Sequence, residues 1–186
     1  MSGASFIKYL AFVLMTLFAL LGGLFAVGYA IEDPGGWRAA LLVSSYMVPA
    51  AILCVVALVR PEPAGPILIA LTALMVLFND VDAIARFIPR DSWGPVGAVG
   101  ALMLSAAIGF LGVHRPTLAG VLLMVVALGQ MVAALTQGLG HGEGVPLRAA
   151  LGGSTGIVVV PLILIGVLFL VAGRWAGGSA PVPVTR

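Results

Sequence analysis

The chain has 186 residues, of which 61% are hydrophobic and only 9% are charged, and its mean hydropathy is +1.19. A soluble domain has about 25% charged residues, so this composition excludes a soluble protein and predicts a single polytopic membrane domain over residues 1–186. The formal net charge of +2 comes from residues spread along the chain without a basic tract, which gives no support for nucleic-acid binding.

Six apolar segments, each close to the length of a membrane span, follow one another along the chain. They cover approximately residues 6–30, 38–59, 64–81, 95–113, 117–136 and 149–172, and a short tail follows at 173–186. The first segment could be a secretory signal, but it is longer than the usual apolar region of one, and we interpret it as a membrane helix. The predicted fold is an all-α integral membrane protein, a bundle of six transmembrane helices.

Two short sequences recur at related distances. Residues 60–65, RPEPAG, return 55 residues later as RPTLAG at 115–120, and the RAAL sequence of 38–41 recurs 110 residues later at 148–151. One period of about 55 residues explains both matches and predicts duplicated two-helix hairpins. Chance similarity between short apolar sequences is the alternative.

The distribution of charge predicts the orientation of the bundle. With six spans, one side carries Lys8, Arg60, Arg115, Arg174 and Arg186 against Glu62, and the other side carries four arginines and six of the seven acidic residues. Under the positive-inside rule we expect both termini in the cytoplasm. The Arg-rich composition, with a single Lys, favours the cytoplasmic membrane of a bacterium.

Two features of the spans concern packing. Small residues recur at four-residue spacing, which permits close approach of helices within the bundle or, alternatively, in a homo-oligomer or with a membrane-protein partner. These residues are Gly22, Ala26 and Ala30, then Ala101, Ser105 and Gly109, then Gly152 and Gly156. Pro49 and Pro161 lie inside spans and are expected to kink them, and such paired kinks can shape a cavity.

The densest polar sequence follows the third span. Asn79, Asp82 and Arg86 would share one helical face, and Asp82 and Arg86 have the i,i+4 spacing of an ion pair. Asp80 lies on another face. A carboxylate inside a membrane has a high free-energy cost and is a functional candidate, whereas one at the interface has a low cost. This segment is therefore either a ligand site or an interfacial anchor. The anchor is the simpler interpretation.

Other polar candidates lie in the connections on the same side. Arg38 and Arg148, near the starts of two spans, could bind an anionic group, or they could pair with acids beside them. His141 and Glu143 could contribute to a metal site, although a solvated, glycine-rich loop explains them without a ligand.

The chain has no HExxH or CxxC sequence. The glycine-rich GGSTG at 152–156 has GxSxG spacing, but it lacks the lysine of a phosphate-binding loop. We therefore expect neither catalysis nor a bound cofactor. The predicted function is that of a binding, scaffold or accessory subunit of a membrane assembly. The alternative is a small transporter or capture component for a small or lipophilic solute, with its site at the extracytoplasmic face. A concave, polar-lined cavity beneath Asp80, Asp82 and Arg148 would favour the alternative, and a closely packed bundle without such a cavity would favour the accessory role.

Overall fold

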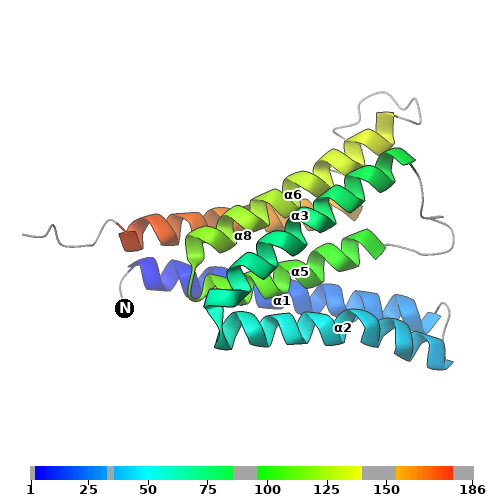
Figure 1. The fold of residues 1–186 in the computed structure, drawn as a ribbon, viewed down its shortest axis with the longest axis horizontal. Coiled ribbons are helices and arrows are strands. Elements are labelled where there is room, and N and C mark those ends of the chain that lie inside the picture. The colour runs from blue at the N-terminus through cyan, green and yellow to red at the C-terminus, as the bar shows by residue number, and fades with distance from the viewer. Residues whose placement is uncertain (1–2, 33–35, 86–95, 140–153, 178–186) are drawn as a thin grey trace, which may run out of the picture.

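The computed structural model describes residues 3–32, 36–85, 96–139 and 154–177, and within these residues it is helical with no strand (Figure 1). The described helices are α1 (Gly3–Glu32), α2 (Gly36–Val59), α3 (Pro61–Ala85), α5 (Val96–Gly112), α6 (Pro116–Leu139) and α8 (Ser154–Gly177). Each of the six predicted segments thus corresponds to a described helix. The all-helical class is confirmed.

Five of these helices are long and apolar enough to cross a membrane: α1, α2, α3, α6 and α8. The exception, α5, has 17 residues, about 25 Å at 1.5 Å per residue, against about 30 Å for the hydrocarbon core of a bilayer. The described residues therefore belong to a multi-pass membrane protein with five long apolar helices and one shorter one. Six complete spans remain a prediction.

The short helix α5 lies at the centre of the bundle (Figure 1). It contacts all five of the other described helices, and its residues 101–109 are buried without interruption. A helix that is apolar on every side and is surrounded by protein over this stretch has little surface left for lipid. The largest fully buried side chains around it include Met15, Leu68 and Phe169.

Glycines allow the helices to approach closely. A Cβ added at Gly120 would lie 2.7 Å from the Gly166 carbonyl oxygen, so the backbones of α6 and α8 are nearly in contact. A Cβ at Gly109 would lie 2.5 Å from Cγ of Met15, between α5 and α1. Gly22 meets Leu102 in the same way. The small residues at these positions pack inside the bundle, which is the intramolecular role considered from their spacing.

Both Arg-Pro turns lie at the same end of the bundle and have the same backbone hydrogen bonds (Figure 1). The Arg60 N–H donates to the Val56 carbonyl and the Arg115 N–H to the Leu111 carbonyl, each over 2.8 Å. The Arg60 and Arg115 carbonyls in turn accept from the N–H groups of Ala64 and Ala119, at 3.2 and 3.0 Å. This similarity is local, and the 55-residue duplication stays a prediction.

Candidate functional site

The acidic end of α3 carries three of the predicted site residues. Asn79, Asp80 and Asp82 lie in its last two turns and are all partly buried. One carboxylate oxygen of Asp80, Oδ1, is buried and has no hydrogen-bond partner among the described residues. A buried carboxylate oxygen without a partner is costly, so this position is more than a solvated helix end.

The other predicted residues do not complete a site in the described structure. Arg86, Arg148, His141 and Glu143 lie outside the described residues. Arg38 is exposed near the start of α2, with its guanidinium carbon 6.0 Å from the centre of the Trp37 ring. Figure 1 shows α2 and α3 diverging toward this end, so Arg38 and the acidic end of α3 are not brought together. Within the described ranges, no three or more His, Cys, Asp or Glu side chains gather where they could hold a metal ion.

A groove of about 440 Å³ lies between α2 and α3, and α5 forms its floor. The α3 wall consists of large apolar side chains, among them Leu74 and Phe78. The α2 wall combines Leu53 with smaller residues, among them Pro49 and Ala50. It occupies the part of the bundle where α2 and α3 separate after their shared turn at Arg60 (Figure 1). Its volume falls within the range of about 300–1,000 Å³ that is usual for small-molecule sites.

The groove is apolar with few polar groups. Ser45 and Tyr46 on α2 are the two lining residues with side-chain hydroxyl groups, and none of the described lining residues is charged. Pockets of this kind bind apolar groups and use a few polar atoms to orient them. The groove can therefore accept a hydrocarbon chain or ring, but nothing in its lining would hold a fully hydrated ion.

Asp82 lies on the groove side of α3. The lining residues Leu71, Met75 and Phe78 are spaced by four and three residues, and Asp82 continues the series four residues beyond Phe78. Residues at this spacing share one face of a helix. Asp82 therefore lies on the groove-facing side of α3, one turn beyond the groove toward the end of the helix.

The sequence contained one signal for this groove. Kinks at Pro49 and Pro161 were considered as a pair that could shape a cavity, and of the two, Pro49 lines the groove. The kinks themselves stay a prediction. The remaining lining residues are ordinary span residues, which have no pattern that distinguishes a groove wall from a lipid-facing surface. Only the divergence of α2 from α3 identifies them.

A second cavity, of about 820 Å³, lies at the opposite end of the bundle, between the start of α1, the start of α6 and the end of α8.

Comparisons with protein-family models, curated proteins and solved structures find no match to this chain. The features of this protein that bear on its function are therefore the two cavities and the acidic end of α3.

Proposed function

We propose that this multi-pass membrane protein binds a lipophilic ligand in the groove between α2 and α3. The proposal corresponds to the capture or transport role considered as an alternative from the sequence, but the groove is apolar and is not the polar-lined cavity that was expected to favour that role. The observation that carries it is the apolar groove of about 440 Å³ on the Pro49 side of α2. The ligand has a single hydrocarbon chain or a small apolar ring system, and its polar end lies toward Asp82.

The shape of the groove favours a chain over a partner helix. Close helix pairing in lipid uses small residues on both partners, whereas the α3 wall of the groove is built from leucine, methionine and phenylalanine side chains. Gly22, Gly109 and Gly120, which could have formed a pairing surface, already pack against neighbouring helices of the same chain. An accessory or scaffold role would require another surface, and it stays a prediction from the sequence.

The polar end of the ligand is argued from Asp82. Asp82 already interacts with another group of the protein, but a carboxylate has two oxygens that can each accept further hydrogen bonds. It can therefore also accept a hydrogen bond from a donor at the polar end of the ligand. This end of the groove is the extracytoplasmic one if both termini are cytoplasmic, as the charge distribution predicts. The site would then load from the outer leaflet.

The proposal is tested by narrowing the groove. Leu74 lines it and is 63% exposed, so a Leu74→Trp substitution adds bulk in the groove without forcing a side chain into the core. We expect the substitution to weaken binding of a pyrene-labelled fatty amine to the protein in nanodiscs by about tenfold, equivalent to about 1.4 kcal/mol. Fluorescence titration measures this binding, with empty nanodiscs giving the partition background.

The matched control is Leu77→Trp. Leu77 is 62% exposed on the same helix but does not line the groove. It should bind the probe as the unmodified protein does. Equal weakening by both substitutions, or no saturable binding above the empty nanodiscs, would contradict the proposal.

A further inference from the structure

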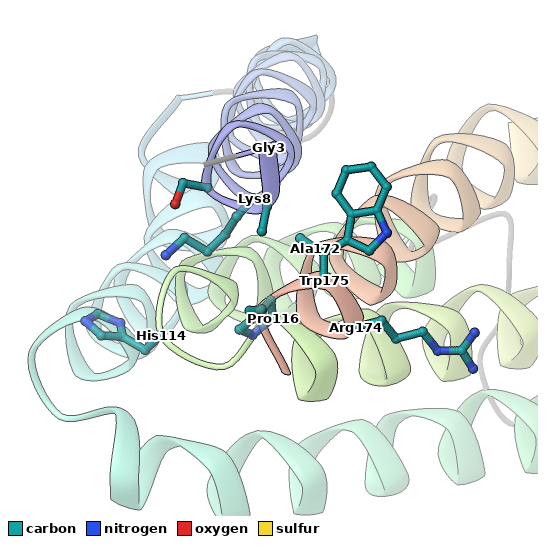
Figure 2. A pocket seen from close by; sticks show the side chains of 10 residues that line it. Gly3, Lys8, His114, Pro116, Ala172, Arg174 and Trp175 are labelled. Atoms are coloured by element: carbon teal, nitrogen blue, oxygen red, sulfur yellow. The ribbon is translucent and has the colours of Figure 1, made fainter. Parts of the chain in front are cut away.

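The second cavity is formed where the two ends of the described chain meet. It lies between the first turns of α1, the start of α6 and the last turns of α8 (Figure 2). A Cβ added at Gly3 would lie 3.5 Å from Cζ3 of Trp175, so the indole ring packs against the first turn of α1. Contacts along α1 and α8 hold this wall of the cavity together.

The cavity is positively charged. Lys8, His114 and Arg174 line it, and its described lining contains no Asp or Glu. Figure 2 shows Lys8 and His114 on one side and Arg174 on the other, with the Arg174 side chain extending away from the other two. The nearest described acid in the fold, Glu62, begins α3 and is not part of the lining. Basic groups on both sides, without a carboxylate between them, favour an anion with several acceptor oxygens.

The cavity also borders the apolar surface of the bundle. Lys8 lies inside the apolar helix α1, and its amino group lies 5.0 Å from the centre of the Tyr9 ring, which is exposed. Trp175 is 56% exposed at the end of α8. Tyr and Trp concentrate at membrane interfaces, and a Lys inside a span extends its amine toward the headgroups.

We propose that this cavity binds the phosphate-bearing headgroup of an anionic phospholipid. Lys8 contacts the phosphate oxygens, His114 supplies a further hydrogen-bond donor, and the Arg174 side chain turns toward the glycerol oxygens when the lipid binds. The acyl chains then lie along the exposed apolar surface beside Tyr9 and Trp175. A soluble phosphate would satisfy the same basic groups but would leave this adjoining apolar surface unused, so the lipid is the better occupant. This site is separate from the groove, and it does not depend on the function proposed for the groove.

The test measures thermal stabilisation of the full chain in a neutral detergent. Added phosphatidylglycerol should raise the Tm, because a ligand that binds only the folded state stabilises it, and phosphatidylcholine should raise it much less. Lys8→Gln and Arg174→Gln should each lose most of the shift given by phosphatidylglycerol. Lys8→Arg, which keeps the charge, should retain it.

The control is Arg60→Gln, which removes a positive charge at the same end of the bundle but outside the cavity. It should keep the full shift. Inorganic phosphate and glycerol 3-phosphate form the second arm, and we expect no stabilisation by either. A shift of equal size with these soluble anions, with phosphatidylcholine, or in Lys8→Gln and Arg174→Gln would overturn the proposal.

Discussion

At Gly120 the backbones of α6 and α8 are nearly in contact. The position that a Cβ would take there lies 2.7 Å from the Gly166 carbonyl oxygen and 2.9 Å from the Leu170 amide nitrogen. Both atoms belong to the backbone of α8 and cannot turn away as a side chain could. In lipid, where packing stabilises the bundle, such a contact replaces the hydrophobic stabilisation available in water.

We therefore expect Gly120→Ala to lower the stability of the folded protein by about 1–3 kcal/mol, because α6 and α8 must separate to admit one methyl group. Thermal unfolding in detergent measures the change. Gly28→Ala is the control: nothing lies within 4 Å of a Cβ at Gly28, which is exposed on α1. There, alanine should be neutral or should stabilise the helix by up to about 1 kcal/mol. Equal losses of stability in both variants would contradict this account of α6 and α8.

Thr72 and Thr16 differ in how their hydroxyl groups are satisfied. Thr16 Oγ1 donates to the Phe12 carbonyl over 2.9 Å, whereas the buried Thr72 Oγ1 has no hydrogen-bond partner among the described residues. We expect Thr72→Val to be neutral or to stabilise the protein by about 1 kcal/mol, and Thr16→Val to destabilise it by about 0.5–1.5 kcal/mol. Denaturation of the two variants side by side measures the difference. A clear loss of stability in Thr72→Val would show that its hydroxyl is bonded in the folded protein.

At the level of helices, apolar runs predicted where each element lies, but its ends depended on local chemistry. The third span was expected over 64–81, and α3 in fact covers Pro61–Ala85. Proline fits the first turn of a helix because no N–H donor is needed there, so α3 begins before the apolar run. At its other end, Asn79, Asp80 and Asp82 are polar but do not break a helix. Hydropathy therefore placed the end of α3 too early.

Hydropathy also placed the end of the last helix too early. This helix was expected over 149–172, whereas the structure describes α8 as Ser154–Gly177, and residues 149–153 lie outside the described residues. Arg174 and Trp175 continue the helix beyond the apolar run, since neither residue terminates a helix. These added turns position the basic and aromatic side chains of the second cavity. Hydropathy alone ended the helix before them.

The central position of α5 gives a prediction about packing. Ile108 on α5 is fully buried, whereas Ile52 on α2 is 57% exposed. Replacing a buried isoleucine by alanine leaves a cavity, so we expect Ile108→Ala to cost about 2 kcal/mol or more. Ile52→Ala should cost much less, because lipid can fill the space. Thermal unfolding compares the two variants, and a similar loss for both would contradict the central position of α5.

In the whole molecule, both cavities result from the way in which helices are arranged, and this is where sequence reasoning stops. The spacing of Gly22 and Gly109 predicted close contacts but could not show that Leu102 and Met15 are their partners. The divergence of α2 and α3, which opens the groove, has no sequence signal beyond Pro49. Lys8, His114 and Arg174 are far apart in the chain, and only the meeting of α1, α6 and α8 places them around one cavity.

The orientation of the molecule also gives a prediction. Trp37 and Glu62 are exposed at opposite ends of the bundle, at the starts of α2 and α3 (Figure 1). If both termini are cytoplasmic, a membrane-impermeant maleimide applied to intact cells should label Trp37→Cys but not Glu62→Cys. The natural Cys54 is first replaced by alanine, so that each variant has one cysteine. The reverse labelling pattern would show that the orientation is inverted.

The lipophilic-ligand groove is the central claim, and photo-crosslinking tests it most directly. A fatty amine with a diazirine in its chain would be activated in membranes containing the protein, and labelled residues would be located by mass spectrometry. The account predicts that unlabelled fatty amine suppresses labelling at Leu53, Leu74 and Phe78, which line the groove. Leu24 and Phe25, more exposed on α1 than any of these, report nonspecific contact with lipid and should show no such competition. Competition that is equal at α1 and at the groove, or absent from both, would contradict the account.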